Sequence, residues 1–275
     1  MNAKSNIPKE KIYNDAGTFN KSSAAQKGAF YFLQKKIMLR PKALRRDFVF
    51  SFNFPFREIN IPFGTKYNFN LIQFFPETSE RKGIVLYFHG NRDNILRYAK
   101  HVPNFTKHKY EVWINDYPEY GKSTGKFTEE NVYRQALILY DMALERYSRE
   151  NIVFYGKSLG SGIATWLASE RGCKHLILET PYYSMADLFH VHAPEFLAKR
   201  FIHFKFPNYE NIQKVTAPIT IFHGTHDRII PYATTVRLQD YLKPGDEFIT
   251  LQNASHNNVN EYTQYHEKLD SILSD

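Results

Sequence analysis

The chain has 275 residues, is 43% hydrophobic and carries a formal net charge of +8. A chain of this length and apolar content can bury a large core, which suits a soluble enzyme with one α/β domain. No segment reaches the roughly eighteen apolar residues that a bilayer-spanning helix needs, and the single cysteine, Cys173, excludes an internal disulfide.

The N-terminal region precedes the first predicted strand. Residues 1–28 are rich in Lys, Asn, Ser and Ala and lack the apolar core of a signal peptide, so we expect a mobile polar tail and a cytoplasmic protein. Residues 29–56 are expected to form an arm ahead of a catalytic domain at 57–275. The scattered basic residues predict a solvated face and no nucleic-acid partner, while a peripheral membrane contact stays open where they are densest, at Lys35, Lys36, Arg40, Lys42, Arg45 and Arg46.

Strand-like and helix-like segments alternate along the rest of the chain. The longest predicted helix covers 129–147, and another covers 261–273 near the end. This alternation predicts a mostly parallel, doubly wound α/β sheet, with the first two strands as an antiparallel edge because no helix separates them. The eight predicted strands are 57–61, 69–75, 83–88, 110–115, 151–155, 175–179, 219–222 and 247–251.

The pattern GxSxG, typical of a nucleophilic serine on a strand-to-helix turn, occurs twice. One copy centres on Ser123 and the other on Ser158, and a lysine precedes the serine in both. The chemistry needs a strand that runs directly into the turn and a helix that leaves it directly. Around Ser158 this is met, because the apolar strand 151–155 comes before the motif and helix-like spacing follows over 161–170. Ser158 is therefore the predicted nucleophile.

The flanks of Ser123 do not meet the same requirement. The residues after the strand at 110–115 include Pro118, which cannot continue a central strand. After the motif, a short stretch separates it from Thr128, which has the character of a helix N-cap. We therefore interpret Ser123 as a loop residue.

Two later strands are followed by the partners that a nucleophilic serine requires. Asp227 follows the strand at 219–222 and His256 follows the strand at 247–251. Serine, aspartate, histidine is one of the chain orders in which catalytic triads occur. In such a triad the histidine accepts the serine proton, and the aspartate orients the histidine. Glu179, at the end of another strand, is the second choice for the acid. The other histidines considered as base are in less suitable positions, at His223, His226 and His266.

The remaining parts of the site are predicted from position. The backbone N–H of Leu159, just after the nucleophile, and that of Asn91, after the strand at 83–88, are the expected oxyanion donors. No metal or other cofactor is expected, since the nearest histidine pair, His190 and His192, has no third ligand at a convincing spacing. Both Gly-Lys-Ser segments lack the upstream glycine of a phosphate-binding loop.

These motifs, taken in order, resemble the α/β-hydrolase superfamily, in particular its Bem46-like and serine aminopeptidase-like (S33-type) branches. The resemblance implies hydrolysis of esters, thioesters or amides through an acyl-enzyme. It also implies that the segment from Asp116 to Gly125 is a loop, although Pro118 and Glu119 stand where relatives tend to carry Arg-Gly. The similar segments are Phe88-His89-Gly90-Asn91, Asp116-Tyr117-Pro118-Glu119-Tyr120-Gly121-Lys122-Ser123-Thr124-Gly125, Gly156-Lys157-Ser158-Leu159-Gly160, Glu179-Thr180-Pro181-Tyr182 and His223-Gly224-Thr225-His226-Asp227.

Residues 181–215 lie where this fold usually carries a cap over its pocket. Their aromatic residues, including Tyr182, Tyr183 and Phe189, are the predicted substrate contacts, with packing of the cap onto the sheet as the alternative. The short cap favours small to medium acyl groups, so the expected function is a carboxylesterase that acts on small-molecule acyl esters. An acyl-protein thioesterase, an aminopeptidase-like amidase with Glu119 or Glu179 holding the substrate amine, and a non-catalytic binding protein are the alternatives.

Overall fold

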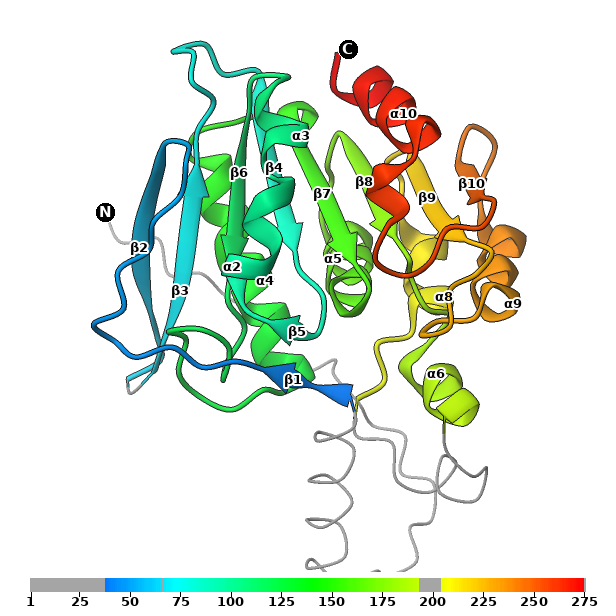
Figure 1. The fold of residues 1–275 in the computed structure, drawn as a ribbon, viewed down its shortest axis with the longest axis horizontal. Coiled ribbons are helices and arrows are strands. Elements are labelled where there is room, and N and C mark those ends of the chain that lie inside the picture. The colour runs from blue at the N-terminus through cyan, green and yellow to red at the C-terminus, as the bar shows by residue number, and fades with distance from the viewer. Residues whose placement is uncertain (1–37, 66, 193–203, 275) are drawn as a thin grey trace, which may run out of the picture.

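The computed structural model describes residues 38–65, 67–192 and 204–274 (Figure 1), so the predicted tail at 1–28 lies outside the described residues. Its centre is an eight-stranded sheet with the spatial order β10-β9-β8-β7-β4-β6-β3-β2. Six of these strands run parallel, and the first two form the antiparallel edge that the sequence predicts. The strands are β2 (Phe56–Phe63), β3 (Tyr67–Phe74), β4 (Gly83–Phe88), β6 (Tyr110–Asn115), β7 (Ile152–Lys157), β8 (His175–Glu179), β9 (Ile219–Gly224) and β10 (Glu247–Leu251).

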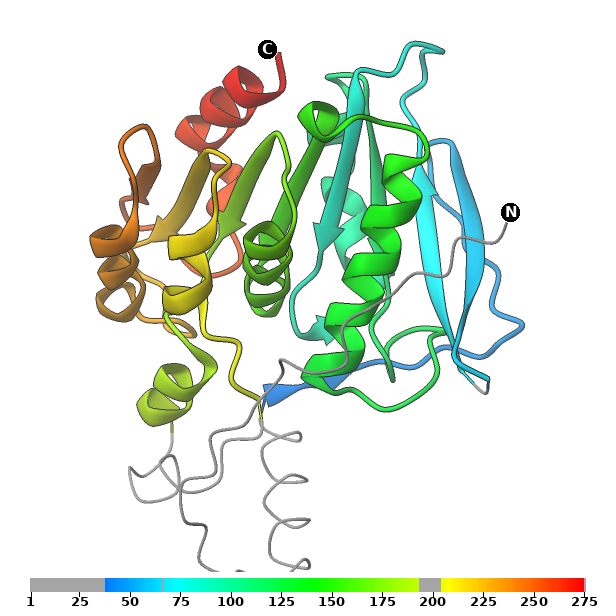
Figure 2. The same cartoon turned by 180° about the vertical axis from the view of Figure 1, so that it is seen from behind.

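Helices cover both faces of this sheet. Figure 2 shows α4 (Glu129–Leu144) and α5 (Leu159–Glu170) on one face, and Figure 1 shows α2 (Ile95–Tyr98), α3 (Pro103–Thr106) and α10 (Thr263–Ser274) on the other. Strands covered on both sides bury every residue, which explains the continuous apolar runs of β4 and β7. Each face therefore has its own buried core.

Local sequence explains where α4, the longest helix described, begins. Thr128 Oγ1 accepts a hydrogen bond from the N–H of Asn131 at 3.1 Å, which caps α4 one residue before Glu129. The helix ends at Leu144, before the predicted end at 147, and the side chain of Arg146 reaches the carboxylate of Glu111 at 2.6 Å. The shorter helical segments are α6 (Met185–His192), α8 (Asn208–Asn211), α9 (Tyr232–Thr235), η1 (Ala99–His101), η2 (Arg149–Asn151), η3 (Ile212–Lys214), η4 (Val236–Tyr241) and η5 (Val259–Glu261).

The described part of the N-terminal arm crosses the carboxyl edge of the sheet. It forms a second, two-stranded parallel sheet, in which β1 (Arg40–Pro41) pairs with β5 (Arg92–Asp93), and in Figure 1 this pair lies near α6 at that edge. Further along, Phe50 is buried in the core of the α3 and α10 face. The sequence did not predict the β1–β5 pairing.

None of the helices in the described ranges combines the length and the hydropathy of a bilayer-spanning segment.

Candidate active site

Ser158 occupies the tight turn between β7 and α5. Its backbone has φ 51° and ψ −115°, a strained conformation for a serine. The flanking glycines are required by close packing, because a Cβ at Gly156 would lie 2.7 Å from Cβ of Ala164 and a Cβ at Gly160 would collide with the carbonyl of Phe88. This is the geometry that exposes a serine hydroxyl above the sheet.

The structure brings Asp227 and His256 to this serine. Nδ1 of His256 lies 2.7 Å from Oδ2 of Asp227, and Nε2 of His256 lies 3.1 Å from Oγ of Ser158. These distances fit an Nδ1–H that donates to the carboxylate and a serine hydroxyl that donates to Nε2. All three side chains are buried. The arrangement suits transfer of the serine proton to the imidazole.

Asp227 is held as a carboxylate by its surroundings. Its Oδ1 accepts hydrogen bonds from the backbone N–H groups of Ile229 and Ile230, at 2.8 and 2.9 Å. Burial alone would raise the pKa of Asp227, but the hydrogen bond and charge of His256, with the Ile230 N–H, outweigh burial and lower that pKa. An ionised Asp227 can therefore stabilise an imidazolium at His256.

Glu179, the second choice for the acid, has a different role. Its carboxylate is buried, ion-paired with Lys157 and hydrogen-bonded by the hydroxyl of Tyr155, which lies 2.8 Å from the hydroxyl of Tyr265. Burial would raise the pKa of Glu179, but the positive charge of Lys157, a smaller contribution from His101 and the hydrogen bonds from Lys157 and Tyr155 together outweigh burial and lower that pKa. The backbone N–H of Ser158 also donates to the carbonyl of Glu179 at 2.9 Å. Glu179 thus anchors the strand end that carries Ser158.

Of the other histidines considered as base, His223 lies beside the carboxylate of Asp227 in the structure. It is buried, its Nε2 lies 2.9 Å from the carbonyl of Ile230, and the same nitrogen is 3.5 Å from Oδ2 of Asp227. Burial lowers the pKa of His223, so it stays neutral and supports the Asp227 loop. It makes no contact with Ser158 among the interactions of the described residues.

The two predicted oxyanion donors flank Ser158. Leu159 is the first residue of α5, where backbone N–H groups have no partner within the helix. Asn91 follows β4, and the carbonyl of the preceding residue, Gly90, lies 2.7 Å from Nδ1 of His89. Because a trans peptide places its C=O and N–H on opposite sides, this contact fixes the direction of the Asn91 N–H.

The side chain of His89 is positioned by two tyrosine rings and by the carboxyl group of Asp116. Its ring stacks on Tyr117 with centroids 4.2 Å apart and on Tyr98 at 5.0 Å, and its Nε2 lies 3.5 Å from Oδ1 of Asp116. On the other side of the loop, the Asn91 carbonyl accepts from the hydroxyl of Tyr120 at 3.0 Å. The sequence singled out the turn but not these supports, since aromatic stacking across loops has no local pattern.

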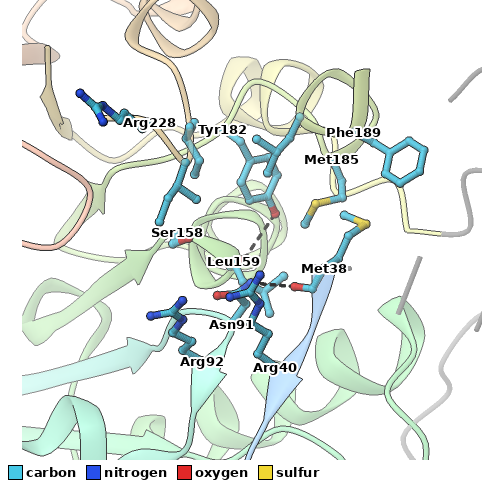
Figure 3. A pocket seen from close by; sticks show the side chains of 13 residues that line it. Met38, Arg40, Asn91, Arg92, Ser158, Leu159, Tyr182, Met185, Phe189 and Arg228 are labelled. Atoms are coloured by element: carbon cyan, nitrogen blue, oxygen red, sulfur yellow. Dashed lines mark hydrogen bonds between the residues drawn. The ribbon is translucent and has the colours of Figure 1, made fainter. Parts of the chain in front are cut away.

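A cavity of about 420 Å³ opens beside Ser158 (Figure 3). Tyr182 and Phe189, two of the predicted contacts, line it together with Asn91 and Leu159. Tyr183, predicted with them, is not among the lining residues; its ring stacks on Tyr209 at 4.6 Å and lies under the guanidinium of Arg237. Met185, another residue of 181–215 with the apolar surface to line an acyl site, also lines it. The lining residues that the sequence did not assign to the pocket are Met38, Arg40, Arg92, Leu188, Arg228, Ile229 and Ile230.

Only some of these lining residues had a usable sequence signal. Arg228, Ile229 and Ile230 directly follow the predicted acid, so their place near the pocket could have been inferred from the chain order. Met38 and Arg40 reach the pocket through the β1–β5 pairing, which no local pattern indicates. Among the residues that the structure describes, no group of three or more His, Cys, Asp or Glu side chains could hold a metal, and the side chains of His190 and His192 lie outside that description.

Comparisons with known proteins agree with this architecture. The profile of the serine aminopeptidase (S33) family matches residues 79–210. The α/β-hydrolase domain-containing protein 17C of Xenopus tropicalis is 31% identical over 193 residues, which are 69% of this chain and 61% of the relative. The human protein 17B is 30% identical over 196 residues, 70% of this chain and 67% of the relative. The match thus spans about three fifths of the 17C relatives.

Solved structures share the fold at low sequence identity. An esterase of Pyrococcus furiosus superposes with a TM-score of 0.65 at 17% identity, covering 86% of this chain and 97% of the esterase. An α/β hydrolase of Vibrio vulnificus gives a TM-score of 0.70 at 16% identity, covering 94% and 98%. The fold class predicted from the sequence is confirmed.

Proposed function

The chain belongs to the α/β-hydrolase superfamily, and on that premise we propose that it is a serine hydrolase that cleaves small to medium acyl esters through an acyl-enzyme. The observation that carries the proposal is the hydrogen-bonded series from Asp227 through His256 to Ser158 at the side of a largely apolar cavity. A cavity of about 420 Å³ is at the small end of ligand pockets, which favours small to medium acyl groups.

The reaction proceeds in two halves. Oγ of Ser158 attacks the ester carbonyl carbon while its proton passes to Nε2 of His256, and Asp227 stabilises the imidazolium. The N–H groups of Leu159 and Asn91 donate to the oxyanion, each worth about 3 kcal/mol in the transition state. The bond to the leaving oxygen breaks, that oxygen takes the proton from His256, and the acyl group stays on Ser158. Water then attacks with His256 as base, releasing the acid and restoring the serine hydroxyl.

The amidase alternative has less support from the pocket. Oε1 of Glu119 accepts from the N–H of Phe127 at 3.2 Å, and Glu179 is paired with Lys157. Among the described residues that line the cavity, none is acidic, so no carboxylate there is placed to hold a substrate amine. A thioester would pass through the same steps as an ester, and substrate comparison separates the two.

Active-site labelling tests the proposal. A fluorophosphonate should label Ser158 in the folded protein and not in heat-denatured protein, with the modified peptide identified by mass spectrometry. Ser158→Ala should abolish labelling, and Asp227→Asn should lower kcat about 10⁴-fold because the imidazole loses its orientation. Labelling that persists in Ser158→Ala contradicts the assignment. Folded wild-type protein with no burst and no turnover of any activated ester would instead favour the binding-protein alternative.

A substrate series defines the acyl preference. We expect kcat/KM on p-nitrophenyl esters to rise from acetate to medium chains and then to fall once the chain exceeds the cavity. Acyl thioesters and aminoacyl amides of matched chain length, measured beside these esters, distinguish an esterase from a thioesterase and an amidase.

A further inference from the structure

Two hollows meet at Ser158. The larger one is the cavity described above, and the smaller one is lined by His256 and Lys157, among others. The residues common to both are Asn91, Arg92, Ser158 and Ile229, so the nucleophile stands between two compartments. In Figure 3 the apolar side chains of Met38, Met185 and Phe189 lie on one side of the cavity, and Arg92 and Arg228 lie on the side of Ser158.

The chemistry of acyl transfer assigns a role to each compartment. His256 must return its proton to the leaving group, so the leaving group must lie within reach of Nε2 of His256. The smaller hollow contains His256, and the larger one contains the methionines and Phe189. The acyl chain therefore fits the part of the larger hollow that Met38, Met185 and Phe189 line, and the leaving group fits the side with His256.

The leaving-group side is strongly cationic. Arg92 lines both hollows and Arg97 lines the smaller one. Arg228 and Arg40 line only the larger cavity, and Figure 3 shows Arg228 on its Ser158 side. Arg97 is partly neutralised by Asp93 at 3.2 Å, and Lys157 is neutralised by Glu179. Within the described part of the chain, no carboxylate lies within ion-pair distance of Arg92 or Arg228, and no acidic side chain lines either hollow.

We propose that the substrate has a negatively charged leaving group, an alcohol or thiol that bears a phosphate or carboxylate, and that Arg92 and Arg228 bind this charge. The inference rests on the proposed function and specifies its substrate class. A guanidinium offers two parallel N–H donors that match the oxygen atoms of a carboxylate or phosphate. Apolar side chains have no donors with which to bind such an anion. Because both arginines are exposed, their contribution is moderate and sensitive to salt.

Two pairs of substrates test the inference. S-butyryl-4′-phosphopantetheine and S-butyrylpantetheine share the thioester and differ in one phosphate of the leaving group. The butyrate esters of 3-carboxy-4-nitrophenol and 4-nitrophenol share the nitrophenyl ester and differ in one carboxylate. The readout is the ratio of kcat/KM for the anionic substrate to that for its neutral partner. Wild-type protein should show a ratio of about ten or more in at least one pair, mainly through KM, and the pair identifies phosphate or carboxylate.

Variants assign the preference to the two arginines. Arg92→Gln and Arg228→Gln should each lower the ratio severalfold, and the double variant should bring it near one. Arg149→Gln, an exposed arginine of η2 that lines neither hollow, is the matched control and should keep the wild-type ratio. Raising the salt from about 50 to about 500 mM should also lower the wild-type ratio.

The outcomes separate this inference from the proposed function. Turnover of the neutral substrates with a ratio near one in both pairs overturns the inference and leaves the serine hydrolase intact. A preference that survives in the double variant also overturns it, because the charge would then be bound elsewhere. Loss of all turnover in wild-type protein would instead count against the proposed function.

Discussion

Two segments of this chain share the sequence Tyr-Gly-Lys-Ser and differ in everything that surrounds it. Ser158 stands between β7 and α5 with its hydroxyl 3.1 Å from Nε2 of His256. Ser123 lies in the loop after β6, where its hydroxyl donates to the carbonyl of Asp116 at 2.6 Å and accepts from the N–H of Asn70 at 2.8 Å. One hydroxyl is available to a base, and the other is fully used by the backbone. The pentapeptide alone therefore says little about the reactivity of its serine, which depends on the strand and helix on either side.

The lysines of the two segments show a parallel contrast. Lys122 pairs with Glu58 at 2.8 Å, and Lys157 pairs with Glu179. The side chain of Glu58 is 24% exposed and that of Glu179 only 1%, so water can solvate the first carboxylate and not the second. The lysine before the serine thus forms an ion pair in both segments: Lys122 from a loop, and Lys157 from the end of the central strand β7.

The largest expected difference between the two segments is in turnover. Ser158→Ala should lower kcat on p-nitrophenyl butyrate by roughly 10⁴-fold or more, because the proposed acyl-enzyme forms on the Ser158 hydroxyl. Ser123→Ala should leave kcat/KM close to wild type, as its hydroxyl faces the backbone. Steady-state assays of both variants, after circular dichroism has established folding, provide the test. A large loss of kcat/KM in Ser123→Ala would contradict the assignment of Ser123 to a loop without a catalytic role.

Stability should separate the two lysines. Lys157→Met leaves Glu179 buried and unpaired, so it should lower the free energy of unfolding by about 3–5 kcal/mol. Lys122→Met should cost about 1 kcal/mol, since Glu58 is partly hydrated and keeps its hydrogen bond from Asn70. Urea unfolding gives both values. The double variant Lys157→Met/Glu179→Gln should recover part of the loss, and equal losses in the two single variants would contradict this comparison.

Carboxyl groups beside the two serines should respond oppositely to acid. The folded-state pKa of Asp227 is lowered, so its stabilising contribution is present above about pH 4 and lost as the pH falls below that value. Asp116 accepts from the Ser123 hydroxyl through its backbone carbonyl, and its carboxyl is buried nearby. Burial raises the pKa of this carboxyl, so the folded state gains stability from its protonation as the pH falls towards about 4.

Urea unfolding at a series of pH values tests these signs. Asp227→Asn should flatten the decline in stability below about pH 4, and Asp116→Asn should remove a gain just above that value. The same pH dependence in wild type and both variants would show that neither carboxyl titrates as its environment indicates.

The stability change expected in Ser123→Ala is smaller than that in Lys157→Met. The variant loses both hydrogen bonds of the hydroxyl and leaves the N–H of Asn70 and the carbonyl of Asp116 without them, at a cost of about 1–3 kcal/mol. Thermal unfolding measures it. Ser123→Thr keeps a hydroxyl and serves as the control, and stability unchanged in the alanine variant would mean that water replaces the hydroxyl.

The sequence was sufficient where local patterns carry the information. Buried parallel strands such as β4 and β7 are short apolar runs between breaks in the pattern. The ends of β7, β9 and β10 place Ser158, Asp227 and His256 at one edge of the sheet. Since the carboxyl ends of parallel strands share that edge, three residues that are far apart in sequence can be grouped from chain order alone.

Other features depend on contacts that have no local pattern. Tyr182 and Tyr183 are adjacent and chemically alike, yet the loop turns the first into the cavity and the second onto Tyr209. The two-residue pairing of β1 with β5 is too short to recognise and joins segments about fifty residues apart. The boundary predicted at residue 57 therefore separates the arm from a cavity to which it contributes.

The arm holds one of the proposed oxyanion donors as well as a wall of the pocket. The side-chain amide of Asn91 donates to the carbonyl of Met38 at 2.7 Å, and the N–H of Arg40 donates to the carbonyl of Asn91 at 3.0 Å. Displacing the arm would remove Met38 from the cavity wall together with its contact to Asn91, so docking of the arm and binding of a ligand that contacts Met38 would favour each other to the same degree.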